Sequence, residues 1–403
     1  MNRLNFLLNN PVEKFADGLL KKTSLGSIKV KYPSGKIVSY KGNHKGPSAE
    51  ITLNNFNLFY KLIKKGSVGL AESYINKDFT TQNLSGFLMF AKQNQISFLN
   101  TMEANWTYKI FSKLKHKLNK NTKNKSKSNI KYHYDLGNQF YKLWLDDSMT
   151  YSSGLFNSYN NSEDLFQAHV NKYKCIADNL KLKYNSTLLE IGCGWGGFST
   201  YAAKNYGTNV NAITISKEQY EYTKKKIFNE GLNEKINVEL KDYRDVNEKF
   251  DYIASIEMFE AVGKEYWELF FNKIKGSLKE NGSAAMQIIT INDDKAENYQ
   301  RNPDFIQQYI FPGGVLPSKT QLRKIATCSN LNLIEYNSFG RSYAKTLQLW
   351  NQQFQKSWNQ IAKQGFTLKF KRMWEYYFSY CEIGFSTKYT DVSQFLINNK
   401  NEA

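Results

Sequence analysis

From about residue 131 onward, short apolar runs rich in β-branched residues alternate with stretches of helical spacing. The strand-like runs are TLLEIG, VNAITI, INVEL, FDYIASI, SAAMQIITI and LNLIEY. Strands that alternate with helices predict βαβ units, in which the strands form a mostly parallel sheet. We therefore expect an α/β fold for this part of the chain.

The region before residue 131 has a different pattern and predicts a second, smaller α/β domain. GSIKVKYPSGKIVSYKG predicts a β-hairpin, because two alternating runs flank a Pro-Ser-Gly turn. FNLFYKLIKKGSVGLAESYIN has apolar residues three and four apart and predicts a helix. A chain of 403 residues is long enough for two domains. We expect an N-terminal domain over residues 1–105, a Lys-rich linker over 106–130 and a larger domain over 131–403.

The chain carries a net charge of +19, which favours polyanionic partners such as nucleic acid or anionic lipid. Lys and Asn usage that follows genome base composition is the alternative explanation. Residues 113–131 are rich in Lys, Asn and Ser and include no acidic residue. This segment predicts either a solvated connector or a polybasic strip that binds anionic lipid headgroups.

Several features bear on the compartment. No apolar run is long enough to span a bilayer, and the hydrophobic stretch at the start is too short for a signal peptide. The four cysteines form no CxxC pair and there are four histidines, so neither a disulfide framework nor a metal site is expected. We therefore expect a cytosolic, reducing compartment.

The run LLEIGCGWGG predicts a strand that leads into a nucleotide-binding glycine turn. Gly192 and Gly194 let the backbone pass close to a ligand. The spacing also satisfies GxGxxG, so NAD stays open as the cofactor. Glu190 can hold a cationic amino group, which favours S-adenosylmethionine (SAM). An NAD site expects an acid about twenty residues further on, where this chain has Thr214 and Gln219 instead.

Two glutamates, Glu257 and Glu260, stand among apolar residues in SIEMFEAVG, at the end of the strand-like run FDYIASI. A buried carboxylate without a partner is costly, so both residues need an explanation. KDYRDV, after the third strand, offers Tyr243 to an adenine ring, and a packed Tyr in a surface turn is the alternative.

Seven ordered motifs together resemble the cyclopropane fatty acid synthase family, whose members are SAM-dependent methyltransferases acting on unsaturated phospholipid acyl chains. The motif IKKGSVGLAESYINKDF is also similar to the N-terminal domain of this family. The seven motifs are HYDLGNQFYKLWLDDSMTYSSGLF, LEIGCGWGGFS, ITISKEQ, DYRDV, SIEMFEAVG, QYIFPGGVLPS and FGRSYAKTLQLW.

The resemblance implies a Rossmann-like methyltransferase that converts cis double bonds of phospholipid acyl chains to cyclopropane rings. Methyl transfer leaves a carbocation, a base removes a proton, and the ring closes. Aromatic faces stabilise cations, and the aromatic segment 342–385, which predicts two long helices broken at Gly365, can supply them. Ordinary core packing is the alternative role for each of these aromatic residues.

The resemblance assigns the role of base to a bicarbonate ion held in a small polar cage. Glu260 and Tyr343 match the glutamate and tyrosine of that cage, and Ile289 matches a residue that contributes its backbone. Ser153 stands where the family often has Cys, and Gln287 where it often has His. Both keep a polar group, but Gln287 cannot titrate. Deprotonation at another carbon, giving methylene or methyl-branched chains, is therefore the alternative outcome.

The same residue-by-residue match implies a SAM site around the glycine turn. Its expected residues are Tyr151 and Ser152 at the methionine end, Glu190, Gly192 and Gly194 beside it, Thr214 and Gln219 at the ribose, Tyr243 at the adenine, and Ile256 and Glu257 in the pocket wall.

Rival functions predict features that this sequence lacks. A base-methylating enzyme usually has an Asn/Asp-Pro-Pro-aromatic motif where this chain has IEMFE, and no Cys here follows a Pro, so we expect no nucleic-acid partner. A non-catalytic lipid-binding protein predicts loss of the glycine turn or of Glu260. A small-molecule methyltransferase does not explain the lysine strip. We expect peripheral association with the inner face of the cell membrane, and the resemblance alone implies a homodimer.

Overall fold

The computed structural model describes residues 11–99, 136–159 and 163–400, which form two compact units. The first unit draws its described residues from Met1–Lys115 and Ala362–Ile383, and the second from His116–Ile361 and Gly384–Ala403. The expected Lys-rich linker, 106–130, lies outside the described residues, as does the whole 113–131 strip.

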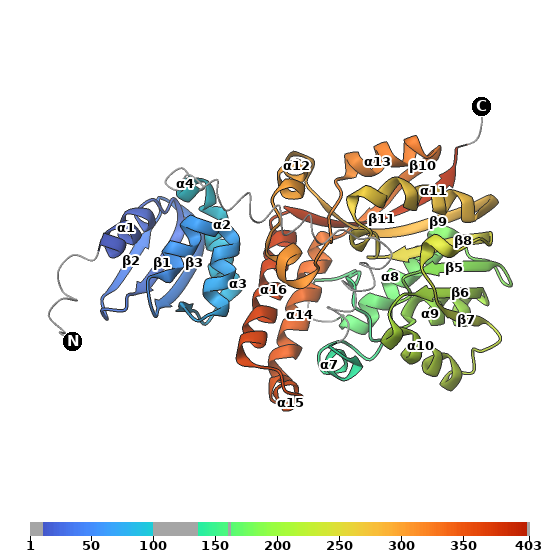
Figure 1. Ribbon diagram of the computed structural model, residues 1–403, viewed down its shortest axis with the longest axis horizontal. Coiled ribbons are helices and arrows are strands. Elements are labelled where there is room, and N and C mark those ends of the chain that lie inside the picture. The colour runs from blue at the N-terminus through green and yellow to red at the C-terminus, as the bar shows by residue number, and fades with distance from the viewer. Residues whose placement is uncertain (1–10, 100–135, 160–162, 401–403) are drawn as a thin grey trace. The chain divides into compact units, whose positions relative to one another are not determined.

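The first unit is built on a small sheet with strand order β2-β1-β3-β4 (Figure 1). The hairpin expected from the Pro-Ser-Gly turn is confirmed, because β1 and β2 pair antiparallel. The expected helix is also present as α2, with a kink at Gly66. The elements are α1 (Pro11–Leu20), β1 (Leu25–Lys31), β2 (Ile37–Lys41), β3 (His44–Leu53), α2 (Asn57–Ile75), β4 (Phe79–Thr80), α3 (Leu84–Gln93) and α4 (Gln95–Leu99).

A segment from late in the chain completes the first unit. Most of helix α16 (Leu368–Ser386) falls within Ala362–Ile383. Arg372 donates hydrogen bonds to the carbonyl oxygens of Tyr74 and Phe79, at 2.6 and 3.1 Å. The Tyr74 hydroxyl donates to Glu375 at 2.8 Å. The compact units therefore group this helix with N-terminal residues, although it follows the catalytic motifs in sequence.

The second unit contains a seven-stranded sheet with order β10-β11-β9-β8-β5-β6-β7. The pairs β5–β6, β5–β8, β6–β7 and β8–β9 are parallel, whereas β11 is antiparallel to both of its neighbours. The mostly parallel sheet expected from the sequence is thus confirmed. Its strands are β5 (Thr187–Ile191), β6 (Asn209–Thr214), β7 (Ile236–Leu240), β8 (Phe250–Ile256), β9 (Leu278–Ile291), β10 (Leu331–Ser338) and β11 (Thr390–Asn399).

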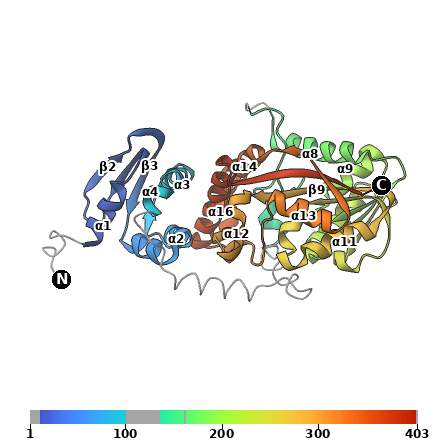
Figure 2. The ribbon, with the colours of Figure 1, turned by 90° about the horizontal axis from the view of Figure 1, so that it is seen from above.

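Helices cover both faces of this sheet. Figure 2 shows α8 and α9 on one face and α11 and α13 on the other. An apolar core lies on each side, one around Phe198 and one around Phe270. The helical elements of the unit are α7 (Asn138–Lys142), α8 (Leu165–Leu180), α9 (Gly197–Tyr206), α10 (Lys217–Asn229), η2 (Tyr243–Asp245), η3 (Phe259–Ala261), η4 (Lys264–Tyr266), α11 (Trp267–Ser277), α12 (Asp293–Arg301), η5 (Ile306–Ile310), α13 (Lys319–Cys328), α14 (Gly340–Lys356) and α15 (Trp358–Lys363).

The C-terminal segment differs from the expectation of two long helices. The first expected helix is divided at Ser357 into α14 and α15. The Ser357 hydroxyl donates to the carbonyl oxygen of Leu143 at 2.6 Å, a tertiary contact that the sequence pattern does not show. The expected break at Gly365 is confirmed, with φ of +93° between α15 and α16.

Candidate active site

The glycine turn joins β5 to α9 at the carboxyl end of the parallel strands. Gly192 has φ of +79°, and a Cβ there would lie 2.7 Å from Cγ of Met258. Gly194 also has positive φ, and the space beside its Cα is open. The amides of Gly192 and Cys193 donate to the carbonyl oxygen of Ile213, which ties the turn to the end of β6. The backbone here is therefore open and fixed, as close approach of a ligand requires.

Glu190, on β5, is buried just before this turn. The hydroxyl of Ser199, on α9, donates to its carboxyl group. Burial raises the pKa of Glu190 to about 7, while Ser199 and the ammonium groups of Lys226 and Lys172 oppose the rise. The carboxyl group of Glu190, which the sequence assigned to the SAM amino group, is therefore held by a hydrogen bond from helix α9.

Thr214 and Gln219, expected at the ribose, lie together at the end of β6 and the start of α10. The Thr214 hydroxyl donates to Oε1 of Gln219 at 2.9 Å. Ser216 caps α10, because its Oγ accepts from the amide of Gln219. Both residues are buried, and Thr214 ends β6, the strand that pairs with β5 before the glycine turn.

Tyr243, expected at the adenine, is buried in η2 and packs edge-on against Phe270 with centroids 5.0 Å apart. Burial raises its pKa to about 12. Asp242 forms a two-pronged ion pair with Arg244, at 2.8 and 2.7 Å. Asp242 is a buried acid next to the expected adenine contact that the sequence reasoning passed over. Ile256 ends β8 and packs against the α8–α9 core.

Three residues far apart in the sequence donate hydrogen bonds to the Glu257 carboxylate. Oε1 accepts from the Ser153 amide at 2.9 Å and from Nε2 of Gln287 at 2.7 Å. Oε2 accepts from the Tyr343 hydroxyl at 2.6 Å. Ser153, Gln287 and Tyr343 are all buried. The sequence placed Glu257 in the SAM pocket wall, whereas its carboxylate lies at the centre of the residues expected to cage bicarbonate.

The backbone at Glu257 is also unusual. Its φ is +51°, in the left-handed region that glycine favours, and it directly follows β8. Its amide donates to the carbonyl oxygen of Gln287 at 2.9 Å. Strained backbone of this kind persists where surrounding contacts fix it, and it is enriched at functional sites.

A buried lysine lies close enough to Glu257 to affect the pKa of that glutamate. Lys172, on α8, is fully buried and donates to Oγ of Ser152 at 2.6 Å. Burial lowers its pKa to about 7, and the negative charges of Glu257, Asp146 and Glu190 oppose that fall. Ser152 therefore contacts a buried lysine that loses its proton more readily than an exposed one.

Lys172 is a residue that sequence reasoning missed. It falls on the buried stripe of α8, with Ala168, Ile176 and Leu180 at helical spacing. A lysine in the apolar stripe of an amphipathic helix is a signal that could have been read from the sequence.

Glu260 has a different environment from Glu257. One oxygen accepts from the backbone amide of Ile289. The other, Oε2, is buried and has no hydrogen-bond partner among the residues that the structure describes. Burial, and then the charge of Glu257, raise the pKa of Glu260 to about 8. Glu260 is therefore protonated at neutral pH, which avoids two adjacent buried charges.

A series of aromatic rings extends from the glycine turn to Tyr343, which binds the carboxylate of Glu257. Trp195, in the turn, lies 5.0 Å from Tyr141, which lies 5.6 Å from Tyr151. Tyr151 is 5.2 Å from Trp350, and Trp350 is 6.2 Å from Tyr343, whose hydroxyl binds Glu257. We call these five rings, with Phe385 stacked on Tyr343 at 4.3 Å, the aromatic wall.

The residues expected to hold bicarbonate bind a carboxylate of the chain itself. The three donors, Ser153, Gln287 and Tyr343, are aimed at the carboxylate of Glu257. A second anion at the same donors would displace these bonds and meet the charge of Glu257 at close range. These residues therefore do not fit a bound bicarbonate.

Within residues 11–99, 136–159 and 163–400, no three His, Cys, Asp or Glu side chains are grouped as a metal ion would require. No helix in those ranges is long and apolar enough to cross a bilayer.

Comparison with known proteins identifies relatives. Residues 121–395 match the family model described as mycolic acid cyclopropane synthetase. The cyclopropane-fatty-acyl-phospholipid synthase of Escherichia coli K12 is 33% identical over 342 residues, which cover 84% of this chain and 85% of that protein. The tuberculostearic acid methyltransferase UfaA1 of Mycobacterium tuberculosis is 30% identical, covering 83% of this chain and 79% of that protein.

Solved structures are similar as well. The mycolic acid cyclopropane synthase CmaA1, complexed with SAH and CTAB, has a TM-score of 0.62 at 29% identity and covers 67% of this chain and 97% of that one. The cyclopropane synthase MmaA2 from Mycobacterium tuberculosis has a TM-score of 0.63 at 28% identity, with the same coverage. These likenesses confirm the expected α/β methyltransferase fold.

Proposed function

The chain belongs to the mycolic acid cyclopropane synthetase family and is a SAM-dependent methyltransferase, and from this we propose that it forms cyclopropane rings on phospholipid acyl chains. The substrate is a cis double bond in an acyl chain, and the carbon that is added comes from the SAM methyl group. Relatives that share this chemistry by name, and the fold they share, support the proposal.

The single observation that carries the proposal is that Tyr343 contacts both the Glu257 carboxylate and the aromatic wall. Its hydroxyl donates to Glu257, and its ring lies in the aromatic wall that extends to Trp195 of the glycine turn. A carbocation must be formed beside SAM, sheltered from water and brought to a base. Aromatic faces stabilise a cation without attacking it, so a continuous wall between the glycine turn and Glu257 suits this sequence of events.

The chain contributes mainly position and exclusion of water. An isolated double bond is a weak nucleophile, so holding it in line with the SAM methyl group supplies much of the rate enhancement. The aromatic wall is largely buried, with Trp350 and Trp195 almost inaccessible to solvent. This environment reduces capture of the cation by water, which would give an alcohol.

We propose that the enzyme works at the inner face of the cell membrane, with the N-terminal domain serving membrane contact or dimerisation. The net charge of +19 supports attraction to anionic headgroups. Such binding is screened by salt. Cosedimentation with phosphatidylglycerol vesicles should therefore fall steeply as salt is raised, and binding that does not change with salt would contradict the electrostatic part of the proposal.

The experiment that tests the function uses the purified full chain, SAM and vesicles of cis-monounsaturated phosphatidylglycerol. Released fatty acids are analysed by mass spectrometry and proton NMR. The expected result is a gain of one CH2 with loss of olefinic protons and appearance of upfield ring protons. The same mass gain with an exocyclic methylene signal would replace cyclopropanation by the methylene alternative. No mass gain would contradict both.

A further inference from the structure

Resting on the proposed function, we propose that Glu257 is the catalytic base that removes the proton from the methylated acyl cation. The base is then part of the chain, and no bound bicarbonate takes part. The substrate and the methyl donor are those of the proposed function.

The first argument is the number of hydrogen-bond sites on the carboxylate. An ionised carboxylate has about four lone-pair sites, two on each oxygen. On Glu257, Oε1 accepts from Ser153 and Gln287, whereas Oε2 accepts from Tyr343. Among the residues that the structure describes, Oε2 has no second donor, so one of its sites can accept a proton. This oxygen binds the hydroxyl of Tyr343, whose ring belongs to the aromatic wall.

The second argument is that all three donors are buried and two of them come from a strand or a helix. Gln287 is on β9, Tyr343 is on α14, and Ser153 is 104 residues away from Glu257 in the chain. Gln287 is itself held, because its Oε1 accepts from Nε2 of Gln394 on β11 at 3.0 Å. Three fixed donors orient the carboxylate without occupying all of it, which is what a positioned base needs.

The third argument is charge. Burial raises the pKa of Glu257, and the nearby ammonium of Lys172 and the three hydrogen bonds oppose that rise. The carboxylate of Glu257 is thus more basic than that of an exposed glutamate. Glu260 is neutral at neutral pH, as its raised pKa of about 8 indicates, and so adds no repelling charge.

The step balances within the groups named. The π electrons of the double bond form a bond to the SAM methyl carbon, and the carbon–sulfur pair returns to sulfur, leaving neutral S-adenosylhomocysteine. The neighbouring acyl carbon becomes a cation. Oε2 of Glu257 takes a proton from the new methyl group, and the released C–H electron pair forms the third ring bond. Glu257 is left as a carboxylic acid, which loses its proton to water after the product leaves.

The strained backbone at Glu257 is consistent with this role. A glycine would adopt φ of +51° more readily, yet the position carries a glutamate whose side chain is held at three points. The three hydrogen bonds to the side chain hold Glu257 in this strained backbone conformation. The positive φ also means that Glu257→Gly suits the backbone, which makes that variant a useful test.

The test compares product formation in CO2-free buffer with and without added bicarbonate. Wild-type enzyme should form product at the same rate in both. Glu257→Gln should lose about 10²–10⁴-fold in turnover, the usual contribution of a general base, and bicarbonate should not restore it. Glu257→Gly leaves the donors of Ser153, Gln287 and Tyr343 open, so its activity should be low without bicarbonate and rise when bicarbonate is added.

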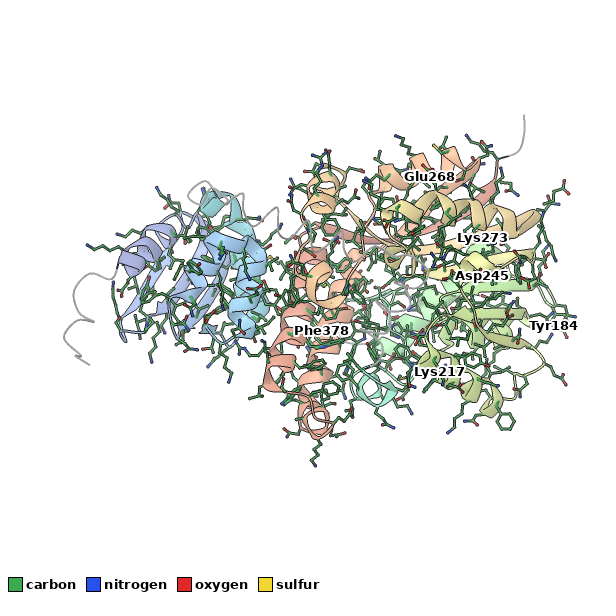
Figure 3. The ribbon with its side chains drawn as sticks, viewed as in Figure 1. Tyr184, Lys217, Asp245, Glu268, Lys273 and Phe378 are labelled. Atoms are coloured by element: carbon green, nitrogen blue, oxygen red, sulfur yellow. The ribbon has the colours of Figure 1, made fainter. Side chains whose placement is uncertain are left out.

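The matched control is Glu268→Gln, which changes an exposed glutamate on α11 (Figure 3) and should match the wild type. SAH binding by calorimetry should be equal in all variants, which shows that the fold and cofactor site persist. Wild-type turnover that requires bicarbonate, or Glu257→Gln that keeps wild-type turnover, overturns the inference while leaving the proposed function standing. A wild-type enzyme that forms no methylated fatty acid under any condition overturns the proposed function, and this inference falls with it.

Discussion

Glu257 and Glu260 are three residues apart, yet their surroundings differ in a way that separates their roles. Glu257 receives three hydrogen bonds to its side chain, and the charge of Lys172 also lowers its pKa. The side chain of Glu260 accepts a hydrogen bond from the Ile289 amide, and its buried Oε2 has no partner among the described residues. Donors favour the charged form of a carboxyl, and burial without donors favours the neutral form.

The comparison teaches that the number of donors, and not the residue type or depth, distinguishes the two glutamates. Burial is the leading cause of a raised pKa for both. The resemblance made Glu260 the glutamate of the cage. The hydrogen bonds instead centre on Glu257. Variants that remove donors from one side or charge from the other therefore test the assignment.

Tyr343→Phe should have the largest effect of the donor variants. It removes the hydroxyl that binds Oε2 of Glu257 and keeps the ring of the aromatic wall. A hydrogen bond to a charged group contributes about 1.5–3 kcal/mol, so kcat should fall about 10–100-fold, measured as product per enzyme on vesicles. Tyr184→Phe, at an exposed tyrosine, is the control and should have no effect. An unchanged kcat in Tyr343→Phe would remove Tyr343 from the account of the base.

Gln287→Met should reduce kcat by about tenfold, near the lower limit for a hydrogen bond to a charged acceptor. The loss is smaller than for Tyr343, because Oε1 keeps its bond from the Ser153 amide. Gln394→Met is the matched control, since it removes the outer amide that holds Gln287 and leaves the bond to Glu257. A larger loss in Gln394→Met than in Gln287→Met would mean that the amide pair serves packing instead of the carboxylate.

Much of the fold could be predicted from the sequence, because its signals are local. Six runs of alternating pattern marked β5 to β10, and the glycine turn is contained in ten consecutive residues. Strand β11 was not predicted: it pairs antiparallel with β9 and β10 and completes the sheet from the last residues of the chain. Its identity depends on partners far away in sequence.

The role of Glu257 could not be predicted for the same physical reason. Its three donors are 104, 30 and 86 residues away along the chain. The sequence located these donors individually, through the resemblance, but not the atom on which they converge. Distances in space are needed to see that convergence.

Glu260→Gln should have a small effect on turnover, at most about fivefold, because the amide resembles the protonated acid and the loss is that of a neutral hydrogen bond. Its Oε1 can still accept from the Ile289 amide. Turnover is measured beside Glu257→Gln in the same assay. If Glu260→Gln falls as far as Glu257→Gln, Glu260 must act as a charged group, and a base that depends on Glu260 replaces the present assignment.

The smallest expected effect is a shift in thermal stability with pH. The pKa of Glu260 is raised from 4.5 to about 8 in the folded protein. A folded-state pKa above the unfolded value means that stability is fully present below pH 4.5 and is lost as pH rises toward 8, because the unfolded chain ionises first. Glu260→Gln does not titrate and avoids this loss.

Melting temperatures of wild type and Glu260→Gln, measured at about pH 5 and about pH 9, form the test. The variant should gain on the wild type by at least about 2–4 °C between the two pH values, the shift that 1 kcal/mol gives in a domain of this size. Glu257 is present in both proteins, and Glu268→Gln is the control for a change at an exposed glutamate. A constant difference between wild type and Glu260→Gln would mean that Glu260 is ionised in the folded protein. The two glutamates would then share a charged site, and the donor count would no longer separate them.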